Sequence, residues 1–206
     1  AQGLGSYYPD GRHIGRAGLV GSFSFSSPKI ISTGQGGALI TDCDDTATKL
    51  RRLKDFGRSG GGNDIHETIG YNFKFTELQA CIGIEQMKKL SDRVVRKKEI
   101  YSLYAELLKD VKEITLFEND NDNTAPWFID ATATDRENLQ SHLKEKDIGT
   151  RVMYPPINKQ KAYELPGDHK VSEFIGISGL WLPSYVQLAD EEIRYICSEI
   201  KEFYMQ

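Results

Sequence analysis

The 206-residue chain has little cysteine, no long hydrophobic run and no excess of basic residues. Its three cysteines, Cys43, Cys81 and Cys197, lie far apart and in no metal-ligand spacing, so we expect reduced thiols and a cytoplasmic location. The longest apolar runs are far shorter than the ~20 residues that span a bilayer. With 30 acidic against 26 basic side chains, the formal net charge is −4. These absences argue against a metal site, a membrane span and a nucleic-acid partner.

What is present is typical of a globular protein. Hydrophobic residues make up 39% of the chain and charged residues 27%, which suffices for one large domain or two small ones. The chain begins Ala-Gln-Gly-Leu-Gly without an initiator methionine. We interpret this start as that of a piece of a longer polypeptide; a small protein released from a tag is the alternative.

The most informative segment reads Gly-Ser-Phe-Ser-Phe-Ser-Ser-Pro-Lys-Ile-Ile-Ser-Thr-Gly-Gln-Gly-Gly and covers residues 21–37. Alternating apolar and small polar residues predict a strand within 18–26, and residues 38–41 predict a second strand after a glycine turn. Lys29 would then lie in or beside a hairpin, among hydroxyl side chains. Burial lowers the pKa of a lysine amine, which favours capture of an aldehyde as a Schiff base. A solvated lysine in a serine-rich loop is the alternative.

Capping residues and helical spacing predict two helices after this hairpin. Asp44 or Asp45 would cap the first, which carries an apolar face of Leu50, Leu53 and Phe56.

The second predicted helix begins with the capping-box pattern of Thr76 and Gln79 and continues to about Lys109. A helix of this length usually spans a domain or links two. We expect the basic residues at 93–98 to form its solvated face.

A polar turn at 119–124 precedes a predicted compact α/β unit. Thr134 and Glu137 form another capping-box pattern, which would open a helix to about Lys146. The other predicted elements are strands at 127–133 and 150–154 and a last helix at 190–204.

Four segments, in order, resemble the DegT-type sugar-nucleotide aminotransferases. These are pyridoxal-phosphate (PLP) enzymes with the aspartate-aminotransferase fold. Besides the lysine segment, Ala1–Gly5 resembles the end of the family's Asp-x-x-Gln-x-x-Gly motif, and Gly70–Ala80 its Gly-Tyr-Asn-Tyr-Arg segment and following helix. Gly149–Pro156 resembles a substrate-facing strand of the small domain. The resemblance covers essentially the whole chain.

The resemblance implies an α/β fold of two parts. Residues 1–110 would form the C-terminal part of the PLP-binding large domain, with a mixed, mostly parallel sheet and a long linking helix. Residues 111–206 would form the small C-terminal α/β domain. The family's aspartate for the pyridine nitrogen would precede Ala1, so we expect this chain alone to be incomplete as an enzyme.

Roles transfer by position to five residues. The resemblance implies that Lys29 binds PLP covalently and then moves protons, and that Ser24 binds the cofactor phosphate. It implies that Gln2 hydrogen-bonds the phenolic oxygen, and that Asn72 reaches the phosphate of the other subunit in a homodimer. Without the motifs, Asn72 would be a turn residue and Gln2 a polar terminal one. Lys74 stands where many relatives have arginine, and it keeps the charge without the bidentate fork.

Arg151 is a further candidate for substrate binding. Its planar guanidinium suits the oxygens of a diphosphate, although a surface charge at a strand edge is an equal alternative. The segments 126–128, 150–158 and 181–183 look most like perosamine-synthase-type members of the family. Those enzymes aminate GDP-4-keto-6-deoxymannose at C4 in surface-polysaccharide biosynthesis.

The implied reaction moves an amino group from glutamate to a keto-sugar nucleotide. Lys29 argues against the dehydratase branch of the family, which has histidine at this position. Asn158 replaces a histidine found in many relatives, so a role for that position in proton transfer is not expected. Two alternatives stay open: an aminotransferase for a UDP- or dTDP-linked sugar or a cyclitol, and a non-catalytic dimerisation or regulatory module.

Overall fold

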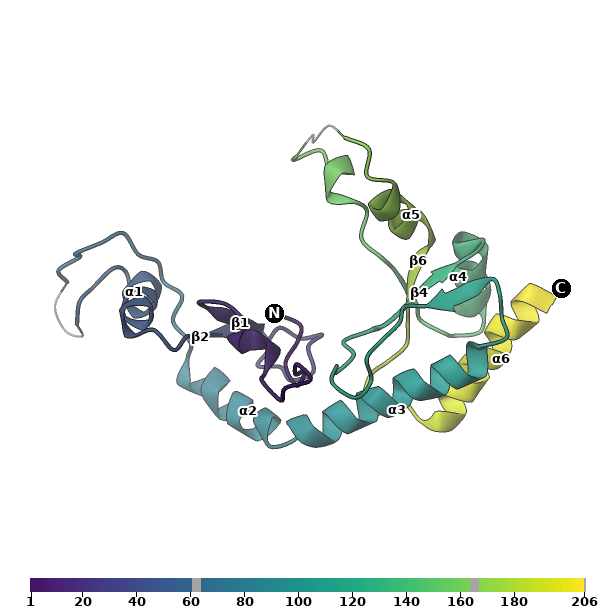
Figure 1. Ribbon diagram of the computed structural model, residues 1–206, viewed down its shortest axis with the longest axis horizontal. Coiled ribbons are helices and arrows are strands. Elements are labelled where there is room, and N and C mark those ends of the chain that lie inside the picture. Colours follow the sequence, from purple (N-terminus) through teal and green to yellow (C-terminus); the bar gives the residue numbers. More distant parts are fainter. Residues whose placement is uncertain (61–63, 164–166, 206) are drawn as a thin grey trace. The chain divides into compact units, whose positions relative to one another are not determined.

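The computed structural model describes residues 1–60, 64–163 and 167–205 (Figure 1). The chain divides into two compact units. The first is Ala1–Val94 with Asn123–Trp127, and the second is Val95–Asp122 with Phe128–Gln206. The units therefore divide inside helix α3 (Leu90–Leu108), whereas the domain boundary predicted from the sequence lies at residue 110 and stays a prediction.

A hairpin carries the lysine segment in the first unit, after a short 3-10 helix, η1 (Ile14–Arg16). Strand β1 (Gly21–Ser24) pairs antiparallel with β2 (Gly37–Ile40), with Ser24 opposite Gly37. This confirms the predicted pair of strands, although β1 is shorter than expected and β2 begins and ends one residue earlier. The loop between them is closed by Phe25 N donating to Gly36 O at 2.9 Å. Lys29 therefore lies beside a hairpin, as predicted.

Gly36 shows why the turn needs glycine. Its φ of 129° lies in a region that residues with a Cβ rarely adopt. A Cβ at this position would also come within 2.4 Å of the Phe75 ring. The backbone of the turn and the aromatic ring can approach each other only without a side chain here.

Helix α1 (Asp44–Lys54) forms where predicted, but its expected cap is wrong. The N-cap is Cys43, which makes no side-chain capping bond, and Asp44 and Asp45 lie in the first turn. Acidic residues there still favour the helix, because they lie near the positive end of its dipole. Phe56 lies beyond the helix with a positive φ of 57°, so it does not extend the apolar face.

Helix α2 (Glu77–Met87) begins with the predicted capping box. Gln79 N donates to Thr76 Oγ1 at 3.3 Å, and Thr76 N donates to Gln79 Oε1 at 3.1 Å. Two of the backbone donors left free at a helix start are thereby satisfied, which confirms the capping prediction.

The prediction of one helix from Thr76 to Lys109 is wrong, because α2 ends at Met87 and α3 begins at Leu90. At the junction, Lys89 N donates to Gln86 O at 3.1 Å, a bond to the third residue back instead of the fourth. This tighter turn interrupts the helix. The side chains on both sides keep helical spacing, so the pattern of apolar residues gave no sign of the break.

The second unit is built on a four-stranded antiparallel sheet in the order β3-β4-β6-β5. Residues 129, 131 and 133 of β4 are buried in alternation, as expected for a strand with one face on the core. The strands are β3 (Ile114–Leu116), β4 (Ile129–Ala133), β5 (Arg151–Val152) and β6 (Gly179–Leu182).

Helices α4 (Arg136–Glu145) and α6 (Asp190–Met205), with the part of α3 that belongs to this unit, supply the rest of its core. The remaining elements are η2 (Ile157–Lys159) and α5 (Lys170–Ser178). The fully buried large side chains of the second unit's core include Ile100, Tyr104, Ile129, Leu139, Leu143, Leu180, Ile193 and Ile200.

The second capping prediction is wrong. Helix α4 has Asp135 as its N-cap, in the left-handed region with φ 51°, and no side-chain capping bond forms. The Asp135 carboxylate instead accepts from Asn138 Nδ2 at 2.9 Å. This Asp–Asn contact takes the place of the bond expected between Thr134 and Glu137.

Every strand pair within the described ranges is antiparallel, so the parallel part of the expected large-domain sheet is not among them. Over these same residues, no helix is both long and apolar enough to cross a membrane.

Candidate active site

Lys29 lies in the loop that joins β1 to β2, and its side chain is half-buried. Its Nζ lies 3.5 Å from the centroid of the Trp127 ring, and Trp127 Nε1 donates to Pro28 O at 2.9 Å. Burial lowers the pKa of the Lys29 amine. Among the described residues no carboxylate pairs with it, whereas the face of the Trp127 ring attracts the charged form and opposes the effect of burial.

The loop is fixed from the side of α3. Arg93 donates one hydrogen bond to Ile30 O at 2.8 Å and another to Gln86 Oε1 at 2.6 Å. Ile31, next along the loop, is only 1% exposed. The expectation that the basic residues at 93–98 form a solvated face is therefore wrong for Arg93, which holds the lysine loop in place.

A second anchor comes from the start of α2. Gln79, the capping-box glutamine, also donates through Nε2 to Gln35 O at 2.8 Å. Thr33 Oγ1 donates to the same carbonyl at 2.7 Å. The glycine turn after Lys29 is thereby tied to a helix N-terminus, which keeps its backbone amides in a defined arrangement.

Two hydroxyl groups lie at the end of β1, five and three residues before the lysine. Ser24 Oγ and Ser26 Oγ are 3.2 Å apart, and both residues are half-buried. With the amine of Lys29, they form a set of groups that fits an aldehyde bearing a phosphate group. Gln2 is exposed, and within the described ranges it forms no hydrogen bond or ion pair with Lys29.

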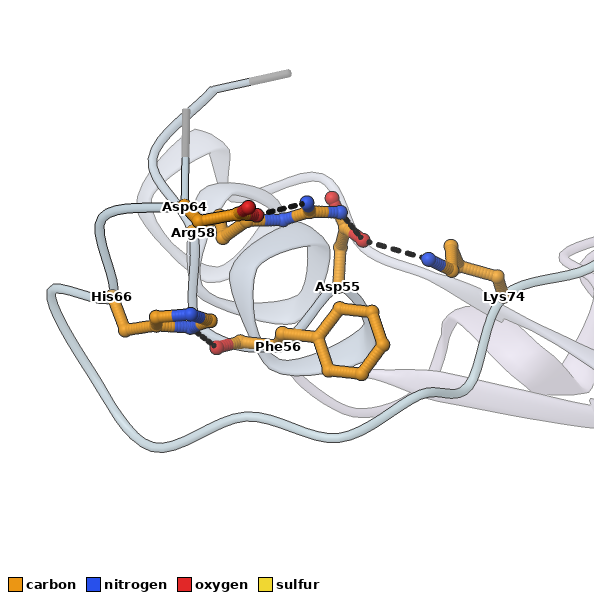
Figure 2. A network of polar contacts seen from close by, with 6 residues as sticks. All are labelled: Asp55, Phe56, Arg58, Asp64, His66 and Lys74. Atoms are coloured by element: carbon orange, nitrogen blue, oxygen red, sulfur yellow. Dashed lines mark hydrogen bonds and ion pairs between the residues drawn. The ribbon is translucent and has the colours of Figure 1, made fainter. Parts of the chain in front are cut away.

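Asn72 and Lys74 belong to the segment that returns alongside the end of α1. Asn72 is exposed, and its backbone forms an isolated antiparallel bridge with Asp55. Lys74 Nζ lies 3.4 Å from Asp55 Oδ1 and 4.4 Å from the centroid of the Phe56 ring. Asp55 also accepts from Arg58 at 2.6 Å, and this bond holds the pKa of the Asp55 carboxyl below its usual range. Figure 2 shows Asp55 between the two cations.

Arg151 lies in the second unit, on β5, whereas the other candidate residues lie in the first. Its guanidinium is exposed and lies 5.2 Å from the centroid of the Tyr154 ring and 5.5 Å from that of Trp181. Trp181 Nε1 in turn donates to Asp130 Oδ1 at 2.6 Å. One guanidinium nitrogen also donates to the Tyr154 hydroxyl at 3.4 Å. The arginine is thus held against aromatic faces with its charge open to solvent, where it can attract an anion.

Sequence reasoning missed Trp127 and Arg93 as parts of this site. Trp127 was expected to begin a strand, and it lies 98 residues from Lys29 along the chain. Only the Trp-Phe pair after Pro126 marked that segment as notable, and nothing in its spacing pointed to the lysine.

The model of the DegT/DnrJ/EryC1/StrS aminotransferase family matches residues 1–201. A GDP-perosamine synthase from Escherichia coli O157:H7 is 33% identical over 208 residues, covering 99% of this chain and 57% of that protein. One from Vibrio cholerae is 26% identical over 204 residues, covering 95% and 55%.

Among solved structures, a DegT DnrJ EryC1 StrS aminotransferase from Brucella abortus matches with a TM-score of 0.91 at 26% identity. The match covers all of this chain and 56% of that one. The chain thus spans a little over half the length of the relatives it matches. Since the family model covers nearly every residue, the chain belongs to the DegT/DnrJ/EryC1/StrS aminotransferase family.

Proposed function

We propose that this chain carries the lysine-bearing part of a PLP-dependent aminotransferase that moves an amino group from glutamate to a keto-sugar nucleotide. The observation that carries the proposal is the Lys29 amine, which is half-buried, has a lowered pKa and lies on a loop anchored from two helices. An amine in this state at neutral pH is suited to bind a carbonyl carbon covalently.

In this proposal PLP supplies the electron sink when it is bound, and the protein supplies orientation and proton transfer. Lys29 would hold the cofactor's aldehyde carbon and, once released by the amino donor, take and return the proton. Trp127 covers one side of its Nζ and keeps water from it. Arg93 and Gln79 fix the loop, so the amine needs little reorganisation to reach its target.

The phosphate of the cofactor would bind at the end of β1. Ser24 would donate its hydroxyl, with Ser26 3.2 Å away. Asn72 presents an exposed carboxamide, which suits the expected role of reaching the cofactor of a second subunit in a homodimer. Gln2 would bind the phenolic oxygen.

For the acceptor we propose GDP-4-keto-6-deoxymannose, aminated to GDP-perosamine. Support comes from the two relatives named above, both described as GDP-perosamine synthases. Arg151 and Lys74 are the cations proposed to bind the sugar nucleotide. The exposed guanidinium of Arg151 is suited to bidentate pairing with phosphate oxygens.

Borohydride reduction of the full-length protein with PLP, followed by peptide mapping, tests the lysine. We expect the reduced adduct on Lys29, and we expect Lys29→Ala and Lys29→Arg to lose both the adduct and the yellow absorbance of the bound cofactor. Lys49→Ala, which removes an exposed lysine on α1, is the matched control and should behave like the wild type. An adduct on any other lysine would show that the assignment is wrong.

The acceptor is tested separately, by half-reactions of the glutamate-treated enzyme with GDP-, UDP- and dTDP-linked keto-sugars. Each acceptor should restore the cofactor's original spectrum at a measurable rate. We expect this rate to be at least 10 times higher with the GDP-linked 4-keto sugar than with the others. Preference for a UDP- or dTDP-linked sugar would overturn the substrate assignment and leave the lysine assignment intact.

A further inference from the structure

A pocket of about 540 Å³ lies between the C-terminal half of α1 and the segment that follows it. Its volume is within the range of sites that take small ligands. More than half of the residues that line it carry charged side chains. The lining residues are Thr48, Arg51, Arg52, Lys54, Asp55, Arg58, Ser59, Gly60, Lys74 and Phe75.

The cations of the pocket outnumber the carboxylates that contact them. Arg52 pairs with Glu67 at 3.0 Å, and Arg58 pairs with Asp64 at 3.1 Å. Lys74 shares Asp55 with Arg58.

Arg51 and Lys54 are the other two cations of the lining, and within the described ranges neither has a carboxylate within 4 Å. Two positive charges in the pocket therefore lack a partner.

One wall of the pocket is held rigidly. Asp55 accepts from Arg58 on one side and contacts Lys74 on the other (Figure 2). Phe56, with its positive φ, is fixed by its own N–H donating to Tyr71 O at 3.0 Å and by His66 Nδ1, which lies 2.7 Å from its carbonyl oxygen. The cations on this wall are therefore positioned before any ligand binds, which lowers the entropy cost of binding.

A donor in this wall is unused. Arg58 Nε is shielded from solvent and has no hydrogen-bond partner in the part of the chain that the structure describes. Because solvent does not reach this atom, a ligand oxygen would bond to it only after the guanidinium moved, and the excess of cations remains the observation that points to an anion.

We propose that this pocket binds a doubly charged, phosphate-bearing ligand, with Arg51 and Lys54 supplying the net charge. Guanidinium groups pair with tetrahedral phosphate oxygens in bidentate fashion, and the lining offers two of them besides Arg58. The hydroxyls of Thr48 and Ser59 line the same pocket and add donors for further oxygens. The ligand would be either the diphosphate of a nucleotide or a free inorganic anion.

The test measures binding of inorganic pyrophosphate to the full-length protein by calorimetry. In the double variant Arg51→Gln/Lys54→Gln, we expect the Kd for pyrophosphate to rise at least 10-fold, because both unpaired charges are gone. The control is Lys49→Gln/Lys89→Gln, which removes the same net charge from exposed lysines outside the pocket and should leave the Kd unchanged. Circular dichroism checks that both variants fold.

Equal pyrophosphate affinity in the two double variants, or no binding by the wild type, would overturn the proposal. GDP, tested in the same way, separates the two sources. If the double variant Arg51→Gln/Lys54→Gln also binds GDP 10-fold more weakly, the pocket is assigned to a nucleotide diphosphate. If only the affinity for pyrophosphate falls, the pocket is assigned to a free anion. Lys74 lines this pocket, so the assignment to a nucleotide diphosphate rests on the proposed function. The pyrophosphate readout is binding alone, so failure of the transamination proposal would leave that result unaffected.

Discussion

Lys97 provides the sharpest test of the packing in the second unit. It was expected on a solvated helix face, but it is only 5% exposed. Its Nζ donates to Ser184 O at 2.6 Å and to Ser184 Oγ at 3.1 Å. Burial lowers its pKa from 10.5 to about 8, and the nearby Asp130 carboxylate offsets only part of that shift. The prediction concerns the variant Lys97→Met, which keeps the length of the side chain and removes the titrating group.

Proton linkage gives the direction in which Lys97 changes stability with pH. The folded state lowers the pKa of Lys97, so between about pH 8 and 10.5 the unfolded chain binds more protons than the folded one. Stability from this group therefore rises with pH across that window. The size of the pKa change corresponds to ~3 kcal/mol. Lys97→Met has no group that titrates at this position. The difference in unfolding free energy, wild type minus variant, should therefore rise by ~3 kcal/mol from pH 7.5 to 10.5.

Urea unfolding at a series of pH values, followed by far-UV circular dichroism, measures this difference. Burial also raises the pKa of Cys197 to about 12, and this costs stability at high pH. That effect is common to both proteins, so it cancels in the comparison. A difference that stays constant within ~0.5 kcal/mol across the window would show that Lys97 titrates like a solvated lysine, and the burial argument would be refuted.

Two further predictions concern the lysine loop. Gly36→Ala should lower the unfolding free energy by ~2 kcal/mol or more, because of its positive φ and the Cβ contact with Phe75; Gly34→Ala, whose Cβ meets nothing within 4 Å, should cost less. Thermal unfolding compares the two, and equal losses would contradict the role given to the ring. Trp127→Leu should lower the pKa of Lys29 further, because leucine keeps an apolar neighbour but removes the ring face that attracts the ammonium. The pH dependence of Lys29 acetylation, read by mass spectrometry, measures this, and an unchanged midpoint would show that the ring does not stabilise the charged amine.

The features that the sequence predicted correctly are those that neighbouring residues determine. The capping box at Thr76 needs only Gln79, three residues away, and the hairpin around Lys29 needs an alternating strand and a glycine turn. The family resemblance assigns a role to the same lysine from contiguous motifs, and that role stays a prediction. In such cases the chemistry that fixes the structure is contained in a short window of the chain.

The features that it missed depend on partners far along the chain. Arg93 bonds to a carbonyl 63 residues away, and Lys97 to a serine 87 residues away. In the sequence both are basic residues within a charged run, and such a run in a helix is typical of a solvated face. Their partners lie on other elements, so only the tertiary structure distinguishes an anchor from a surface charge.

The side-chain amide of Gln79 serves two neighbours at once. Its oxygen accepts from Thr76 at the start of α2, while its nitrogen donates to the carbonyl of Gln35 in the glycine turn. Glutamate would satisfy the first contact equally well, since carboxylates are common at this place in a helix. It cannot serve the second, because a carboxylate offers no proton and would repel the carbonyl oxygen. Glutamate at this position would therefore keep the helix cap and lose the bond to the turn, so a change of a single atom from nitrogen to oxygen would uncouple the helix from the turn.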